Sequence, residues 1–328
     1  MKEVSALLGF RESIRVVDAT LRDGGIVNDF KFGDDFVKEL YQTNIATGVD
    51  YMEVGYKASK KLFDESKFGK WKFCDDDEIF KVLGDNSEKK IKLAAMADVG
   101  RCDYKNDIRD RSNSPLDLIR VACYAHQIPG ALEIIEDAKA KGYEVTCNIM
   151  AISTAQEGDI KVALDMLGKS SVDCIYIVDS YGSIYPEQMQ RIAATYKEFA
   201  DKYGKTLGIH AHNNQQLAFA NTIEAVGDGV DWLDATYSGM GRGAGNCFIE
   251  NLLAFFEKSE IQYLSRAQVR GNKNGRLEKR RRGLGLRRSV SCNGIVESAS
   301  AHGDRIHERK AHGLFQVLRR TNRARIVS

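Results

Sequence analysis

Short apolar, β-branched segments alternate with longer amphipathic segments from residue 14 to about residue 258. Eight of the apolar segments are typical of buried strands, at residues 14–20, 50–56, 91–98, 118–123, 143–150, 173–179, 206–212 and 230–236. The segments between them are helix-like, and some begin at Pro and end at Gly, as helices prefer. The pattern predicts repeated βα units around a parallel sheet.

Eight consecutive βα units favour closure of that sheet into a (β/α)8 barrel, a TIM barrel of the α/β class. A doubly wound open sheet is the main competitor, but the first strand is not followed by a G-x-G-x-x-G turn, and eight units suit closure better. We therefore expect one catalytic barrel over residues 1–260. In such a barrel the active site lies where the strands end and the βα loops begin.

Two histidines end the seventh predicted strand, in the string "GIHAHNN". Side chains two positions apart on a strand share a face, so His210 and His212 form half of a site for a divalent metal. The first strand ends in "DATLRDGG", which supplies Arg22 and Asp23 before a glycine pair expected to let the chain turn tightly. Two histidines and one carboxylate leave positions open for substrate, as catalytic metal sites require. Alternatively, the two histidines only pack in the core or at the surface, and Asp23 caps a helix or pairs with Arg22.

Further polar residues lie at other strand ends. Glu53 and Asp179 could each orient a metal ligand, bind substrate hydroxyls or cap the following helix. Three tyrosines near the same rim, Tyr56, Tyr181 and Tyr237, are candidate proton donors, although packing explains any single one more readily.

The loop "GMGRGAGN" spans residues 239–246 and follows the eighth strand. Its glycines remove Cβ atoms, so the backbone at Gly243 and Gly245 can approach an anion. We therefore count Gly243 and Gly245, with Asp179 and Ser180, as candidate substrate-binding residues. The alternative is a tight turn with Asn246 as the N-cap of the next helix. The connection at residues 60–78 is longer than usual and is either a lid or a charged surface excursion.

Five strand-end motifs occur in order, "DATLRDGG", "MEVGY", "VDSYG", "HAHNN" and "GMGRGAGN". Together they resemble the metal-dependent carbon–carbon lyase and synthase superfamily that includes HMG-CoA lyase, isopropylmalate synthase and 4-hydroxy-2-oxovalerate aldolase. The resemblance covers residues 14 to about 258. It implies that Asp23, His210 and His212 bind Mn²⁺ or Mg²⁺, with Asn246 as a fourth or water-mediated ligand. It also implies that Arg22 stabilises the enolate formed from a 2-oxo acid or hydroxy-oxo acid substrate.

Two departures from these relatives leave the general base open. The glycine loop of HMG-CoA lyase carries a catalytic cysteine, which this loop lacks, and hydroxy-oxovalerate aldolases carry a histidine where this chain reads "GIVNDF". We expect an aldolase-like lyase with Glu53, Asp29 or a rim tyrosine as the base. An acyl-CoA-dependent Claisen-type synthase is the alternative enzyme.

The net charge of +2 conceals a division of the chain. Residues 1–264 carry 31 Lys and Arg against 42 Asp and Glu, whereas residues 265–328 carry 17 against 4. We assign this basic tail to residues 261–328. Three interpretations are open: a nucleic-acid-binding arm, a disordered appendage or the product of translation out of frame. We favour the third, because a one-nucleotide shift with permitted codons turns Leu284–Ser289 into Trp-Gly-Tyr-Asp-Val-Pro, which resembles the C-terminal region of uncharacterised aldolase-domain relatives.

Seven scattered cysteines without a C-x-x-C pair indicate reduced thiols, and no segment has the length of a membrane span or secretory signal. We therefore expect a cytoplasmic enzyme with a small-molecule substrate and no membrane partner. A homodimer is a candidate assembly, and nucleic acid is the partner of the rival hypothesis alone.

Overall fold

The computed structural model describes residues 13–84, 86–88 and 90–256. Within them eight parallel strands form one closed barrel in sequence order, and β8 pairs with β1. The strands are β1 (Arg15–Asp18), β2 (Tyr51–Tyr56), β3 (Lys92–Asp98), β4 (Leu118–Cys123), β5 (Glu144–Ile149), β6 (Cys174–Asp179), β7 (Thr206–Ala211) and β8 (Trp232–Ala235). Each lies inside one of the eight predicted segments, so the (β/α)8 barrel is confirmed.

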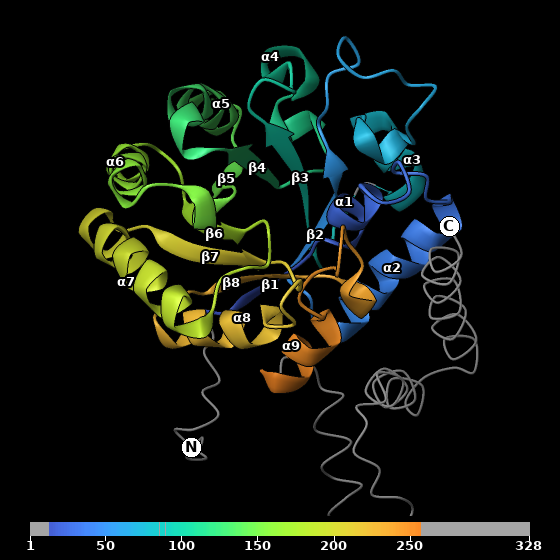
Figure 1. Cartoon of the computed structure of the whole chain (residues 1–328). Helices are drawn as coiled ribbons and strands as arrows, with labels where there is room; N and C mark the ends of the chain where they lie inside the picture. Colours follow the sequence, from blue (N-terminus) through green and yellow to red (C-terminus); the bar gives the residue numbers. More distant parts are fainter. Residues whose placement is uncertain (1–12, 85, 89, 257–328) are drawn as a thin grey trace, which may run out of the picture.

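Helices follow the strands and surround the barrel (Figure 1). Their bounds are α1 (Thr20–Gly25), α2 (Asp34–Thr47), α3 (Asp76–Leu83), α4 (Tyr104–Asp107), α5 (Ile128–Ala140), α6 (Glu157–Gly168), α7 (Pro186–Tyr203), α8 (Ala218–Gly227) and α9 (Ile249–Phe255). The longest, α7, begins at Pro186 and ends before Gly204, whose φ of 66° is left-handed, as the sequence predicts. No helix in the described residues is long and apolar enough to cross a membrane.

Apolar side chains fill the barrel interior mainly from the end where the strands begin. Tyr51, Leu118 and Cys174, each at the start of its strand, belong to this buried cluster. Tyr176 belongs to it as well, and the guanidinium of Arg120 lies 4.5 Å from the centroid of its ring. A charged layer therefore begins directly above the apolar one, toward the ends of the strands.

The glycine pair after β1 is not a tight turn. Gly24 and Gly25 are the last two residues of α1, and neither has a positive φ. Space is the reason for glycine at both positions. A Cβ on Gly24 would lie 2.6 Å from the sulfur of Met240, and one on Gly25 would lie 2.3 Å from the ring of Phe30. This close packing holds α1 over the mouth of the barrel.

The connection from β2 to α3 is more than a charged surface excursion. Trp71, Phe73 and Cys74 within it are buried. The backbone of Gly55, in β2, lies so close to it that an added Cβ would be 1.9 Å from the carbonyl oxygen of Trp71. The basic tail predicted at residues 261–328 lies outside the described residues, so the domain boundary near residue 260 stays a prediction.

Candidate metal and active site

Asp23, His210 and His212 lie together where the barrel strands end. Asp23 is in α1 directly after β1, His210 is in β7, and His212 follows β7. One potential ligand atom from each lies within 4.8 Å of the other two, and all three residues are buried. The alternation of a strand puts the two histidines on one face, with ring centroids 5.1 Å apart. The three side chains could hold one metal ion.

The orientation of His210 fits a metal ligand. Its Nδ1 lies 2.9 Å from Asp234 Oδ2, and because a carboxylate only accepts hydrogen bonds, this contact assigns the ring hydrogen to Nδ1. The other nitrogen, Nε2, is buried and has no hydrogen-bond partner among the described residues. A histidine held by a carboxylate with its second nitrogen free is the usual form of a metal ligand. The donor set therefore fits a divalent cation.

Asn246 reaches Asp23 from the loop between β8 and α9. Its Nδ2 donates to Asp23 Oδ2 at 2.6 Å and to the carbonyl oxygen of Met240 at 3.0 Å. Its Oδ1 is buried and lacks a partner in the described part of the chain. A Cβ on Gly241 would lie 2.2 Å from Asn246 Nδ2, so only glycine fits there. Asn246 thus lies beside the predicted ligands rather than at the N-cap of α9, which is Phe248.

Electrostatics keep the predicted ligands in the protonation states that bind metal. Burial works to raise the pKa of Asp23, but Arg22, His212 and His210 together lower it to about 2. Burial lowers the pKa of His212 to about 4 against the attraction of Asp23, with His210 and Arg22 adding to the decrease. At neutral pH the site therefore presents an ionised carboxylate and a neutral imidazole.

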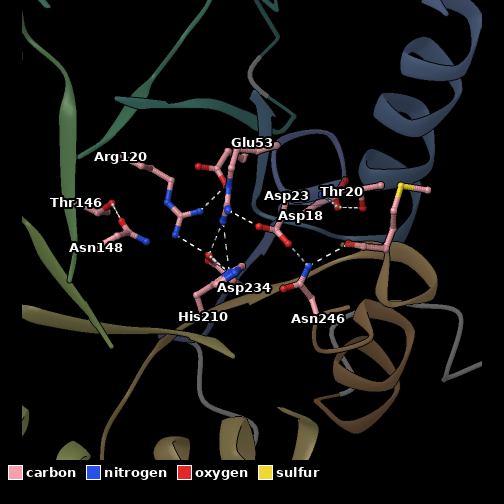
Figure 2. A network of polar contacts seen from close by, with 12 residues as sticks. Asp18, Thr20, Asp23, Glu53, Arg120, Thr146, Asn148, His210, Asp234 and Asn246 are labelled. Atoms are coloured by element: carbon pink, nitrogen blue, oxygen red, sulfur yellow. Dashed lines mark hydrogen bonds and ion pairs between the residues drawn. The ribbon is translucent and has the colours of Figure 1, made fainter. Parts of the chain in front are cut away.

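Asp23 belongs to a buried network of charged side chains that continues through Arg22, Glu53, Arg120 and Asp234; Figure 2 shows the polar contacts of this region. Arg22 donates from Nε to Glu53 Oε2 at 2.8 Å and from Nη1 to Asp23 Oδ1 at 2.7 Å. Arg120 donates to the same Glu53 oxygen at 2.8 Å and to Asp234 Oδ2 at 2.7 Å. Because Asp234 also contacts His210, the network links the position of Arg22 to that of the imidazole. Such a network fixes side chains whose rotamers would otherwise be free.

The sequence prediction did not single out Arg120 or Asp234. Arg120 is in the centre of β4 and Asp234 is in β8, and both are fully buried. Arg120 is the one charge in the segment "LIRVAC", and Asp234 is the one charge within the otherwise apolar strand β8 (Trp232–Ala235). A buried charge is costly unless it is paired, so this pattern is the signal that could have revealed them.

The structure separates the candidate bases. Glu53 is fully buried and its Oε2 accepts from both arginines, so it is placed to position Arg22. Asp29, Tyr56 and Tyr181 line the cavity above the site. Tyr237 lies elsewhere, with its hydroxyl 3.1 Å from a threonine hydroxyl of α2. Burial raises the pKa of Tyr56, although Arg22 lowers it, so this phenol is protonated at neutral pH.

Asp179 and Ser180 have different surroundings. Both carboxylate oxygens of Asp179 accept backbone N–H groups, from Ser183 and Ile184 at 3.2 Å each. Asp179 is buried and caps this turn, and burial raises its pKa despite those hydrogen bonds. Ser180 lines the cavity, and its Oγ accepts from the N–H of Ala151 at 2.9 Å.

The glycine loop takes backbone conformations that favour glycine. Gly243 has φ 63° and Gly245 has φ 87°, both in the left-handed region. A Cβ on Gly245 would lie 1.9 Å from the carbonyl oxygen of Gly239, which closes the loop. The N–H of Asn246 donates to the same oxygen at 3.1 Å. The loop therefore sets the position of Asn246, and its Arg242 lines the cavity.

A cavity of about 430 Å³ lies over the site. The polar and charged residues that line it include Arg22, Asp23, His210 and His212, together with Asp29, Tyr56, Lys72, Asp98, Arg101 and Arg242. Its size suits a small substrate rather than a macromolecule. The fold and this lining define a barrel enzyme with a polar, charge-rich pocket at the ends of its strands.

The HMGL-like family model matches residues 13–266. The oxaloacetate decarboxylase of Mycobacterium tuberculosis is 31% identical over 253 residues, which cover 76% of this chain and 71% of that protein. The 4-hydroxy-2-oxovalerate aldolase of Pelotomaculum thermopropionicum is 30% identical over 251 residues, with 76% and 71% covered. The N-terminal domain of a provisionally named aldolase from Bacteroides vulgatus has a TM-score of 0.64 at 26% identity, covering 88% of this chain and 86% of that one.

The chain belongs to the HMGL-like family. The family and the names of these relatives confirm the predicted carbon–carbon lyase, of the aldolase type. The predicted resemblance to HMG-CoA lyases and hydroxy-oxovalerate aldolases is confirmed as well. The HMG-CoA lyase of Brucella melitensis shares the fold, with a TM-score of 0.58 at 15% identity over 76% of this chain and 91% of that one.

Proposed function

We propose that this protein is an aldolase that requires Mn²⁺ or Mg²⁺ and cleaves or forms the carbon–carbon bond next to a 2-oxo acid. The observation that carries the proposal is the buried triad of Asp23, His210 and His212, in which His210 Nε2 has no partner among the described residues. Asn246 Oδ1, equally without a partner there, is the fourth candidate ligand. A small anionic 2-oxo acid fits the size and charge of the cavity.

A bound divalent cation would supply Lewis acidity for the keto and carboxylate oxygens of the substrate. The protein itself contributes Arg22 to the reaction. Glu53 and Asp23 accept two of its N–H groups and hold the guanidinium in place, while its Nη2 faces His210 at 3.4 Å. A guanidinium fixed in advance stabilises negative charge developing on the keto oxygen without reorganising during the reaction.

Aldol cleavage also requires a base for the substrate hydroxyl. Asp29, Tyr56 and Tyr181 are the candidate bases that line the cavity, whereas Glu53 accepts hydrogen bonds from two arginines. The raised pKa of Tyr56 makes it a proton donor, and we assign the role of proton acceptor to Asp29, the one carboxylate among these three residues. In this role Asp29 takes the hydroxyl proton and Tyr56 returns one to the carbon left by bond cleavage.

Decarboxylation of a 2-oxo dicarboxylate is a second candidate reaction. It develops the same charge on the keto oxygen but needs no base for a hydroxyl proton. The chain lacks the histidine that hydroxy-oxovalerate aldolases carry after the first strand, and this favours a reaction without that step. The M. tuberculosis relative is named for such a decarboxylation.

The proposal is tested by metal content and by turnover of the same preparation. Purified protein is loaded with Mn²⁺, and pyruvate release is measured from 4-hydroxy-2-oxo acids and from oxaloacetate. We expect pyruvate from at least one of them and its loss after chelation. The His210→Ala variant should lose both Mn²⁺ binding and activity, because one ligand and its orienting contact disappear.

His126→Ala is the matched control, since His126 is exposed and stacks on the ring of Tyr124. It should retain both properties. Unchanged Mn²⁺ content in His210→Ala would refute the metal site. Mn²⁺-loaded wild-type protein that turns over none of these acids would refute the substrate class.

A further inference from the structure

The connection between β2 and α3 contributes one wall of the cavity. Phe68 and Lys72, both in this connection, line the cavity together with Phe30 and Tyr56. Gly69 fixes the connection against the loop after α1, because its N–H donates to the carbonyl oxygen of Asp29 at 2.7 Å. A Cβ on Gly69 would lie 2.0 Å from the backbone oxygen of Phe30. The wall is therefore packed tightly against the rest of the site.

Lys72 is the unusual member of this wall. It is 8% exposed, and its Nζ lies 4.4 Å from the ring centroid of Phe63, 4.6 Å from that of Tyr56 and 5.0 Å from that of Phe30. The ring of Phe68 is 5.8 Å away. The electron-rich faces of aromatic rings hold an ammonium group in place but do not cancel its charge. Four rings thus position a cation at the edge of the cavity.

No acidic side chain makes an ion pair with this cation within the described residues. Lys72 has no ion pair or side-chain hydrogen bond there. Asp98, which also lines the cavity, attracts Lys72, and Lys72 lowers the pKa of Asp98 more than Arg101 does, but the two side chains make no ion pair in the described residues. Burial lowers the pKa of Lys72, and Arg101 adds to this, while Asp98 and the thiol of Cys74 oppose it.

The ammonium group of Lys72 lies near the proposed metal and active site. The ring that holds it, that of Tyr56, is within the electrostatic reach of Arg22 and Asp23. Lys72 and the metal candidates line one cavity of about 430 Å³. The cavity therefore contains both the groups proposed to hold the 2-oxo acid and the partly desolvated positive charge of Lys72.

We propose that Lys72 binds a second carboxylate of the substrate, so that the enzyme prefers 2-oxo acids with two carboxylates. The inference rests on the proposed function and extends it to the substrate class. A partly buried ammonium that makes no ion pair of its own gains one from a substrate carboxylate, which replaces the water lost on burial. The aromatic rings position the Nζ in advance, which reduces the entropy lost when the substrate binds.

Binding without turnover is the first test. Mn²⁺-loaded protein is titrated calorimetrically with 2-oxoglutarate and with 2-oxovalerate, which differ in whether carbon 5 is a carboxylate or a methyl group. Neither has the 4-hydroxyl group that aldol cleavage requires. We expect about 10- to 100-fold tighter binding of 2-oxoglutarate, the range typical of a hydrogen bond to a charged group. Equal affinities would overturn the role of Lys72 while leaving the proposed function intact.

The second test compares variants on a matched pair of aldol substrates, 4-hydroxy-2-oxoglutarate and 4-hydroxy-2-oxovalerate. Lys72→Met should lower kcat/KM for the dicarboxylate about 10- to 100-fold, mainly through KM, and leave the other substrate nearly unchanged. Lys72→Arg should keep most of the preference, because it keeps the charge. An equal loss on both substrates would overturn the proposal, since the effect of Lys72 would then not depend on the second carboxylate.

Lys60→Met is the matched control. Lys60 comes from the same connection and lies 5.7 Å from the ring centroid of Phe73, but its Nζ pairs with Glu65 and Asp75 at 2.8 Å and it does not line the cavity. It should keep the wild-type preference. Failure of the Mn²⁺-loaded wild type to bind either 2-oxo acid would overturn both the proposed function and this inference. Equal binding of the two acids by the wild type would overturn the inference even where Lys72→Met does not fold.

Discussion

Asp234 offers the sharpest test of how the buried network supports the metal candidates. The Asp234→Asn substitution removes one negative charge and preserves the shape of the side chain. Asp234 Oδ2 accepts from both His210 and Arg120, whereas its Oδ1 is buried without a partner in the described residues. An asparagine with its oxygen at the Oδ2 position would keep both contacts, so the variant isolates the charge.

The expected magnitude follows from the charges in the network. Arg22 and Arg120 face Asp23, Glu53 and Asp234, two cations against three anions, a formal charge of −1. The substitution brings this to zero and weakens the polarisation of His210. Replacing the orienting partner of a metal-bound histidine usually lowers metal affinity by about 10- to 100-fold, or about 1.4 to 2.7 kcal/mol. We expect a loss of Mn²⁺ affinity in that range.

The assay is a calorimetric titration of the metal-free protein with Mn²⁺ at neutral pH. Burial acts to raise the pKa of Asp234, but Arg120 and His210 lower it, so the wild-type side chain is ionised there. Asp77→Asn is the control, because Asp77 is an exposed carboxylate that pairs with Arg109 at 2.8 Å. Unchanged Mn²⁺ affinity in Asp234→Asn would refute the argument that this carboxylate supports the metal through His210.

Three further predictions concern stability. Arg120→Met leaves Glu53 and Asp234 buried with fewer cations, and should lower the free energy of unfolding by about 3 to 5 kcal/mol in urea titrations. His212, with its pKa lowered by burial to about 4 in the folded chain and near 6.5 when unfolded, binds more protons when unfolded between those values. Metal-free protein should therefore gain up to about 3 kcal/mol as pH rises through that window, and His212→Gln should lose this gain. Gly245→Ala, at φ 87° and with its Cβ 1.9 Å from a carbonyl oxygen, should lower the thermal midpoint and weaken Mn²⁺ binding by displacing Asn246.

Each of these has a result that would contradict it. Equal stability of Arg120→Met and wild type would mean that the buried ion pairs contribute nothing net. A pH slope shared by wild type and His212→Gln would assign the titration to another group. For Gly245, Gly84→Ala is the comparison, since Gly84 also has a positive φ but open space around its Cβ position. A Gly245→Ala variant no more destabilised than that one would remove the steric argument.

The sequence by itself determined the barrel and one half of its site. Local periodicity identifies strands and helices, and eight strands in succession favour closure, so β1–β8 follow from the chain alone. The spacing of His210 and His212 determines that they share a face of β7, because alternation is a property of any strand. Arg22 and Asp23 are adjacent in sequence and follow the first predicted strand, so their place at the mouth of the barrel was predictable from the chain alone, although the structure puts them in α1.

Only the tertiary structure decided which partners these residues have. Barrel closure brings β2, β4 and β8 around one interior, and this makes Glu53 the partner of Arg22 and Arg120 rather than a free base. The same closure gives His210 its orienting carboxylate, Asp234. Such contacts join residues far apart in the chain, so no local pattern encodes them, and the desolvation of charge that makes them necessary exists only once the core has formed. The aromatic cage around Lys72 arises in the same way, from rings that meet only when the β2–α3 connection packs onto the barrel.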